Sequence, residues 1–188
     1  MESNVKFISK EYRKLNEKLH RAPRGFGGDG KKWADRVDFL IQRFGITTLL
    51  DYGCGQSTLW SELKKKYNNS GIIRYYEYDP CVPGKTIVPH QKVDMVVCTD
   101  VLEHVEPEFL ENVITHIHNL ALKVVFLNIN IHLANKVLPD GRNAHLTIQG
   151  RTWWKNMLGC VFKPDNWQIV EMETKRPDKD YVLFLKRV

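Results

Sequence analysis

A carboxylate and two glycines at the end of an apolar run are the first residues in this chain that could bind a ligand. Leu49 and Leu50 lead into Asp51, and Gly53 and Gly55 follow before an amphipathic segment begins. This order predicts a buried strand, a tight turn and the start of a helix. Glycine is needed in such a turn because a Cβ would keep the backbone from bending sharply or from approaching a ligand closely. The turn is therefore expected to hold a small molecule at the carboxyl edge of a sheet.

The residue types of this turn narrow the kind of ligand. The third glycine of the dinucleotide fingerprint is missing, because Thr58 stands at its position. Asp51 would also place a negative charge beside a pyrophosphate, whereas a carboxylate suits a cationic group such as an α-ammonium or a sulfonium. A nicotinamide oxidoreductase is therefore a weak alternative. On this motif alone, an ordinary glycine turn in another α/β protein is a second alternative.

Further acids follow the next two apolar segments. Residues 72–78 are rich in β-branched and aromatic side chains, which predicts a strand that ends at Asp79. In nucleotide-binding α/β folds, an acid at this place binds the ribose, and one carboxylate can accept hydrogen bonds from both hydroxyls. A third apolar run, residues 93–98, leads into Thr99 and Asp100.

Taken in this order, the three segments resemble the class I S-adenosylmethionine-dependent methyltransferases. The acid-x-Gly-x-Gly pattern that starts at Asp51 is similar to motif I, and residues 99–105 are similar to motif IV of the group that includes the ubiquinone-biosynthesis O-methyltransferases. The resemblance implies S-adenosyl-L-methionine as the cofactor, with its methionine end at the glycine turn and its ribose at Asp79. The residues that it implies for cofactor binding are Asp51, Gly53, Cys54, Gly55, Asp79, Thr99 and Asp100.

Two histidines are candidates for a general base. His104 follows the strand that, in the family, ends beside the reacting methyl group, and a neutral imidazole can remove a hydroxyl proton near pH 7. We expect His104 to shape the site rather than to transfer protons, and we take His145 as the first choice for a base. Asp100 and Glu103 also fit a capping box, which would give them a structural role instead.

A polar loop, residues 138–146, follows the fifth strand at the edge where the family inserts its substrate-recognition elements. Arg142 is a candidate bidentate ligand for an anion, and Asn143 is a second candidate for substrate binding. Trp153 could form an aromatic wall for a sugar or a nucleobase. The alternatives are a solvated Pro-Asp-Gly turn and a core position for one member of the Trp153–Trp154 pair.

The elements that must position these residues alternate between strand and helix patterns. This alternation predicts an α/β fold with a Rossmann-like, mostly parallel sheet and helices on both faces. Between residues 78 and 93 there is barely room for the helix and the strand that the family has there, so we expect a shortened region without the family's adenine-contacting acid. The expected strands are residues 48–51, 72–78, 93–98, 123–131, 167–174 and 181–186, the last two as a hairpin-like pair. The expected helices are residues 8–20, 33–44, a segment after the glycine turn, 106–120 and 152–158, with Gly159 as a stop.

Length and composition set the broader limits. With 188 residues, 43% of them hydrophobic and 27% charged, the chain is expected to form a single methyltransferase domain over residues 1–188 and to be cytoplasmic. It has no apolar run of membrane-spanning length, so we expect no membrane partner. The four cysteines form no C-x-x-C pair, which favours reduced thiols. Because no ligand cluster has suitable spacing, no metal site is expected.

The positive charge is concentrated in residues 1–32, which hold nine Lys or Arg and four Asp or Glu and so carry +5 of the net +6. This segment is expected to form a basic helix followed by a glycine-rich loop, residues 21–30, which is either a lid over the cofactor or a plain connector. A basic arm can attract a nucleic acid. A solvated helix face is the favoured explanation, because Glu17 and Arg21 are spaced to pair on one helix face.

The leading function is S-adenosylmethionine-dependent methyl transfer to a small polar acceptor, most simply a hydroxyl of a metabolite or a sugar. One alternative is a nucleic-acid methyltransferase. Another is a non-catalytic protein that binds the cofactor or a partner on the same fold. The oligomeric state is not indicated.

Overall fold

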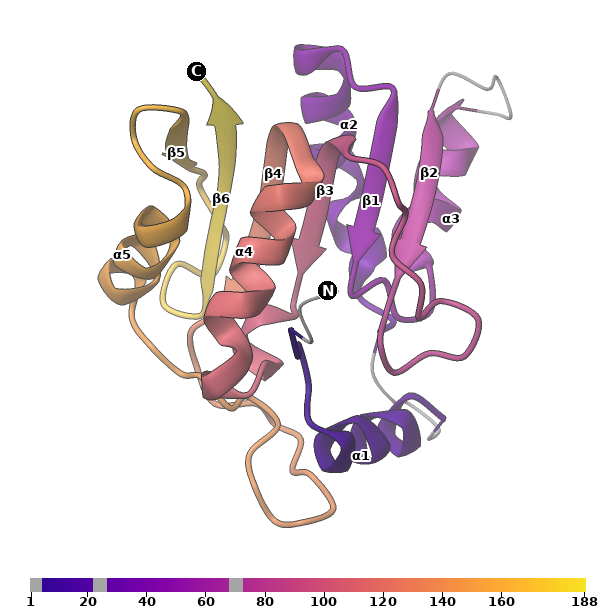
Figure 1. Ribbon diagram of the computed structural model, residues 1–188, viewed down its shortest axis with the longest axis vertical. Coiled ribbons are helices and arrows are strands. Elements are labelled where there is room, and N and C mark those ends of the chain that lie inside the picture. The colour runs from indigo at the N-terminus through magenta and orange to yellow at the C-terminus, as the bar shows by residue number, and fades with distance from the viewer. Residues whose placement is uncertain (1–4, 22–26, 68–72) are drawn as a thin grey trace.

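A single six-stranded sheet forms the centre of the protein, in the order β2-β1-β3-β4-β6-β5 (Figure 1). The computed structural model describes residues 5–21, 27–67 and 73–188. The parallel strands are β1 (Thr48–Tyr52), β2 (Arg74–Tyr78), β3 (Val93–Thr99) and β4 (Ala121–Asn130). The last strand, β6 (Asp180–Arg187), runs antiparallel to both of its neighbours, β4 and β5 (Trp167–Glu171). The mostly parallel α/β sheet with a terminal strand pair confirms the predicted fold class.

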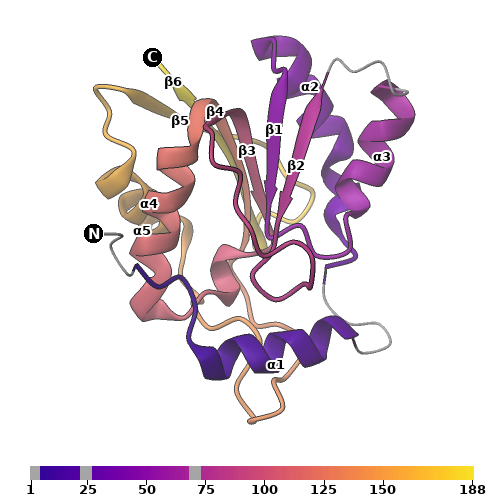
Figure 2. The same cartoon turned by 45° about the vertical axis from the view of Figure 1, so that its right-hand side comes forward.

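Helices cover both faces of this sheet (Figures 1 and 2). Those on one face are α2 (Ala34–Phe44) and α3 (Thr58–Tyr67), and those on the other are α4 (Leu110–Leu120) and α5 (Arg151–Val161). Successive strand residues point to opposite faces. Leu49 therefore packs in the core with α2 and α3, whereas Leu50 packs in the core with α4. Burial on both faces explains why the central strands are nearly continuous apolar runs.

The first helix, α1 (Lys10–Arg21), lies on neither face of the sheet but across the carboxyl ends of the parallel strands (Figure 2). It packs against the loop that follows β4, where Tyr12, Leu138 and Ala144 form a small buried cluster. In the described part of the chain, three 3-10 turns complete the helical elements: η1 (Gly30–Trp33), η2 (Leu102–His104) and η3 (Pro107–Phe109). Within the described ranges, no helix combines the length and the apolar character that crossing a bilayer requires.

The region between β2 and β3 is shortened as predicted. Residues 79–92 contain no helix or strand, so β2 is an edge strand of the sheet. The predicted end of the helix at Gly159 is wrong, because α5 continues to Val161. Leu158 and Phe162 are both buried against the sheet, and the Phe162 N–H donates to the Leu158 carbonyl, so packing on either side of the glycine extends the helix.

Candidate active site

A cavity of about 550 Å³ lies at the carboxyl ends of the parallel strands, with α1 forming part of its wall. This volume is typical of a small-molecule site. The residues predicted for the cofactor or for catalysis that line it are Asp51, Gly53, Cys54, Asp79, Thr99, Asp100, His104 and His145. Gly55 is not part of the lining, but its N–H donates to the carboxylate of Asp79 at 3.1 Å. The fold therefore brings three separate sequence motifs to one cavity.

The glycine turn after β1 has the backbone that its sequence predicts. Gly53 and Gly55 have φ angles of +81° and +49°, a region that residues with a Cβ rarely adopt. A Cβ on Gly53 would lie 2.3 Å from a methyl carbon of Val101, so this position has no room for any side chain. The N–H groups of Gly53 and Cys54 both donate to the Tyr78 carbonyl, which ties the turn to the end of β2.

Part of the glycine-rich N-terminal loop docks on this turn. The Gln56 N–H donates to the Gly27 carbonyl at 3.0 Å, and the Lys31 N–H donates to the Thr58 hydroxyl at 3.2 Å. Gly27, Gly28 and Gly30 line the cavity. Residues 22–26 of the predicted lid lie outside the described residues, and the lid itself stays a prediction.

Asp51 and Asp79, two of the three acids predicted for the cofactor, have different environments. Asp51 is buried and accepts a hydrogen bond from the Tyr75 hydroxyl at 2.7 Å, and burial raises its pKa to about 7. Asp79 accepts from the backbone of Gly55 and of Cys81, and its carboxylate lies 3.9 Å from the imidazole of His20 on α1. Asp51 can thus be neutral or charged near pH 7, and a cation beside it favours the charged form. Asp79 is oriented by the backbone and keeps lone pairs for further donors.

Asp100 and Glu103 do not form the predicted capping box. Asp100 has a φ of +58°, and its carboxylate accepts from the side chains of Asn128, Asn130 and Trp33. Glu103 is fully buried and accepts at Oε1 from the backbone N–H and the side-chain amide of Asn130. The left-handed turn at Asp100 and the amide of Asn130 on β4 divert both carboxylates from the helix start. Burial, and then the neighbouring Asp100, raise the pKa of Glu103 above its ordinary value.

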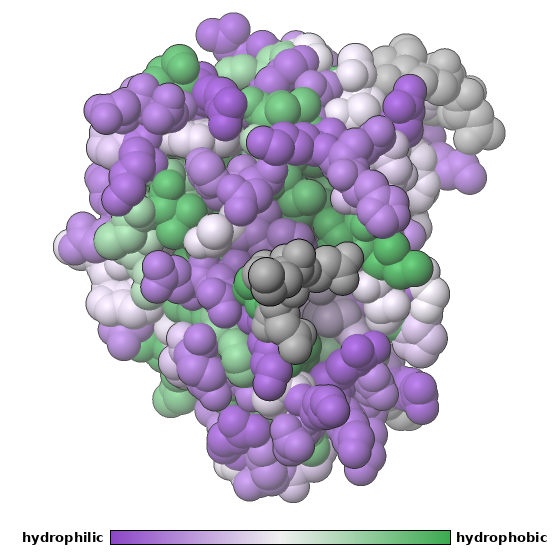
Figure 3. All heavy atoms as spheres, viewed as in Figure 1, coloured by the Kyte–Doolittle hydropathy of each residue, from purple (hydrophilic) through white to green (hydrophobic). Residues whose placement is uncertain are grey.

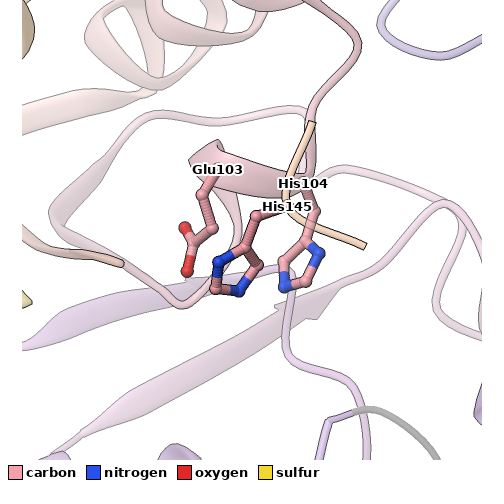
Figure 4. A group of neighbouring side chains, drawn as sticks. All are labelled: Glu103, His104 and His145. Carbon is pink, nitrogen blue, oxygen red and sulfur yellow. The ribbon is translucent and has the colours of Figure 1, made fainter. Parts of the chain in front are cut away.

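The two candidate bases lie side by side. The ring centroids of His104 and His145 are 4.8 Å apart, with the rings nearly perpendicular (Figure 4). Burial, and then the neighbouring His145, lower the pKa of His104 to about 4, and burial also lowers the pKa of His145. Both rings are therefore neutral near pH 7. A pKa of about 4 makes His104 a weak general base, because efficient bases have pKa values near the working pH.

Backbone contacts hold His145 in place beside η2. The N–H groups of Leu146 and Thr147 both donate to the Glu103 carbonyl, at 2.7 and 3.0 Å. The side-chain oxygen of Asn143 accepts the His145 N–H at 2.9 Å. Residues from two distant parts of the chain are thus fixed relative to one another.

The residues predicted for substrate binding lie outside the cavity lining. Arg142 forms a two-pronged ion pair with Asp140, as a Pro-Asp-Gly turn allows, and Asn143 bonds to the backbone of its own loop. Trp153 lies partly exposed on α5, while Trp154 is the fully buried member of the pair. The substrate-binding role of these three residues stays a prediction. The loop instead contributes other side chains to the cavity wall, namely His132, Ala134, Asn135 and Lys136.

Sequence reasoning missed the contribution of α1. Tyr12, Asn16 and His20 line the cavity at four-residue spacing, which places them on one face of the helix. That spacing was readable in the sequence, but the surface to which the face docks was not. Asn130 at the end of β4 and Arg176 before β6 also line the cavity and carried no motif.

Comparison with family models matches residues 7–167 to the methyltransferase domain. A search of the curated proteins finds no match. Among solved structures, the chain is similar to 1,6-didemethyltoxoflavin-N1-methyltransferase from Burkholderia thailandensis, bound to 1,6-didemethyltoxoflavin and S-adenosylhomocysteine. The TM-score is 0.66 at 12% identity, over 99% of this chain and 93% of that chain.

Two further solved structures are similar to the chain. Magnesium protoporphyrin IX methyltransferase from Synechocystis PCC 6803, with bound SAM, has a TM-score of 0.55 at 19% identity, over 84% of this chain and 79% of that chain. A chain of the Pnkp1/Rnl/Hen1 RNA repair complex has a TM-score of 0.58 at 16% identity, over 85% of this chain and 42% of that chain. The chain thus spans less than half of the RNA repair protein. At these identities the structures establish a shared fold.

Proposed function

This chain belongs to the methyltransferase-domain family, and from that premise we propose that it transfers a methyl group from S-adenosyl-L-methionine to a hydroxyl of a small polar acceptor, such as a metabolite or a sugar. S-adenosylmethionine-dependent methyl transfer follows from the family, so the non-catalytic alternative falls away. What we propose beyond the family is the class of acceptor, a small polar compound with a hydroxyl group. The narrower resemblance to the ubiquinone-biosynthesis O-methyltransferases stays a prediction.

The residues at the glycine turn fit the cofactor. A Cβ on Gly53 would collide with the Val101 side chain, so only glycine allows this turn and Val101 to pack together at the wall of the cavity. Asp51 would bind the α-ammonium, since a buried carboxylate with a raised pKa gains most from a cation. Asp79 would accept hydrogen bonds from the ribose hydroxyls. Pro80 and Cys81 line the cavity beside Asp79 and would contact the adenine in place of the missing acid.

One observation carries the proposal: all of the predicted cofactor residues except Gly55 line the same cavity as the two neutral imidazoles. When bound, S-adenosylmethionine supplies a methyl group already activated on a sulfonium. The protein therefore has mainly to align an acceptor oxygen, and alignment can account for much of a rate enhancement. We propose that His145 accepts the hydroxyl proton, because burial and the neighbouring His145 ring lower the pKa of His104 to about 4, which is too low for an efficient base near pH 7.

A nucleic-acid acceptor is the second candidate, and the charge of α1 favours it. The exposed side chains of this helix include Lys10, Arg13, Lys14 and Lys18, and the surface over α1 is mostly hydrophilic (Figure 3). At the cavity itself, however, Lys32 pairs with Asp100 and Arg176 pairs with Asp180. Cations that are already paired attract a polyanion less, which favours a small acceptor.

Two measurements test the proposal. Calorimetry should detect binding of S-adenosylhomocysteine. If no binding is detected, the proposed cofactor site is wrong. Release of S-adenosylhomocysteine should then be followed with a panel of hydroxyl compounds and with RNA and DNA oligonucleotides. Turnover with the small compounds is expected. Turnover with oligonucleotides alone, with binding that weakens steeply as salt rises, would replace the small acceptor with a nucleic acid.

A further inference from the structure

Three side chains of metal-ligand type lie together at the wall of the cavity. One ligand atom each of Glu103, His104 and His145 lies within 4.8 Å of the other two (Figure 4). Both histidines line the cavity. The sequence predicted no metal site because the spacing along the chain is irregular, but the hydrogen bonds from residues 146 and 147 to the Glu103 carbonyl bring the third ligand to the first two.

The hydrogen bonds of both rings favour the protonation state that a metal requires. Nδ1 of His104 lies 2.7 Å from the Ala144 carbonyl, and Nδ1 of His145 lies 2.5 Å from the His132 carbonyl. A carbonyl can only accept, so the proton is on Nδ1 in each ring and the lone pair is on Nε2. Metal-bound histidines in proteins are held in this way, with the second ring nitrogen donating to a backbone carbonyl or a carboxylate.

The carboxylate of Glu103 provides an independent observation. The residue is fully buried, and its Oε2 has no hydrogen-bond partner among the described residues, while Oε1 is held by Asn130. A buried polar atom without a partner is costly, and a buried carboxylate is especially so. The neighbouring Asp100 adds a second negative group. A cation at this place would satisfy the Oε2 atom and reduce the repulsion between the two acids.

We propose that Glu103, His104 and His145 form a binding site for one divalent transition-metal ion, of the class of Mn²⁺, Fe²⁺, Co²⁺ and Zn²⁺. Two imidazole nitrogens and one carboxylate oxygen suit these ions, whereas Mg²⁺ and Ca²⁺ prefer oxygen ligands throughout. Three protein ligands leave coordination positions open toward the cavity. An acceptor oxygen would occupy such a position, where the ion would orient it and lower its pKa. With the ion bound, Nε2 of His145 is a metal ligand, so His145 would act as the general base only in the metal-free protein. The role of the ion in orienting an acceptor rests on the proposed function, whereas the metal site itself does not.

Calorimetric titration of the chelator-treated full chain with Mn²⁺, Co²⁺ and Zn²⁺ tests the site. We expect one ion per chain and an increase in the thermal unfolding temperature of the wild type, because a ligand that binds only the folded state stabilises it. Glu103→Gln and His145→Asn should each weaken metal binding by at least about 10- to 100-fold. Mutation of a residue that only hydrogen-bonds to a metal ligand already causes a loss of this size. His90→Gln, at an exposed position outside the cavity, should bind the ions as the wild type does.

Two further measurements distinguish loss of the metal site from failure of the proposed function and from misfolding of the variants. The visible spectrum of bound Co²⁺ should change in His145→Asn, and circular dichroism checks that both variants are folded. Absence of one-to-one binding to the wild type overturns the site, and so does an affinity in both ligand variants that equals that of the wild type. Binding of S-adenosylhomocysteine to the metal-free chain is measured separately, so either result can fail without the other.

Discussion

Gly27 and Gly55 pack backbone against backbone: a Cβ on Gly55 would lie 2.4 Å from the Gly27 Cα, and a Cβ on Gly27 would lie 2.6 Å from the Gly55 Cα. The first glycine belongs to the N-terminal loop and the second to the turn after β1. Neither position can carry a side chain without separating the two segments. This close approach is what places the loop residues in the cavity wall.

Gly55→Ala should therefore separate the loop from the turn. The positive φ of Gly55 costs an alanine about 1–2 kcal/mol, and the collision with Gly27 adds about 1–3 kcal/mol to the loss in the free energy of unfolding. Gly45→Ala is the matched control, because Gly45 has a similar φ of +57° with no atom within 4 Å. Urea denaturation should show the larger loss for Gly55→Ala, and only that variant should lose affinity for S-adenosylhomocysteine. Equal losses would mean that the contact contributes nothing.

Asp79→Ala should weaken the binding of S-adenosylhomocysteine by about 10- to 100-fold, which corresponds to about 1.5–3 kcal/mol for hydrogen bonds to a charged group. The side chain loses its bonds from Gly55 and Cys81 as well as those proposed from the ribose. Glu77→Gln is a suitable control, since it removes a carboxylate from β2, the strand that Asp79 follows, at a position outside the cavity lining. An unchanged dissociation constant for Asp79→Ala would exclude this acid from the site.

The affinity for S-adenosylhomocysteine should fall as the pH drops through about 7. Burial raises the pKa of Asp51 to about 7 in the free protein, and a bound ammonium favours the ionised carboxylate. Protons therefore compete with the ligand below this pH, and binding releases protons there. Adenosine, which lacks the ammonium, should bind without this dependence. Calorimetry in buffers of different ionisation enthalpy measures the proton release, and a pH dependence that survives Asp51→Asn would assign it to another group.

Local patterns were sufficient to predict most of the fold. The apolar runs gave the strands, and the glycines after β1 gave a turn that the structure contains with positive φ angles. The end of α5 was mispredicted because buried neighbours of Gly159 outweigh its weak helix propensity. The site was only partly predictable, since motifs lie within one segment. The grouping of Glu103 with His145 depends on tertiary hydrogen bonds, and no local pattern reports them.

Asn143→Ala should act on the site through the loop rather than through a substrate. The Asn143 amide accepts from the N–H groups of Ala134 and His145 and donates to the Ala134 carbonyl, at 2.9–3.0 Å. Its removal leaves partly buried backbone groups unpaired, which should cost about 1–3 kcal/mol of stability. Because His145 then loses the bond at its backbone, affinity for Zn²⁺ should also fall, while binding of S-adenosylhomocysteine should not. Arg142→Ala, which removes an exposed ion pair next in the chain, should leave both stability and Zn²⁺ affinity nearly unchanged. If the two variants behave alike, Asn143 does not position His145.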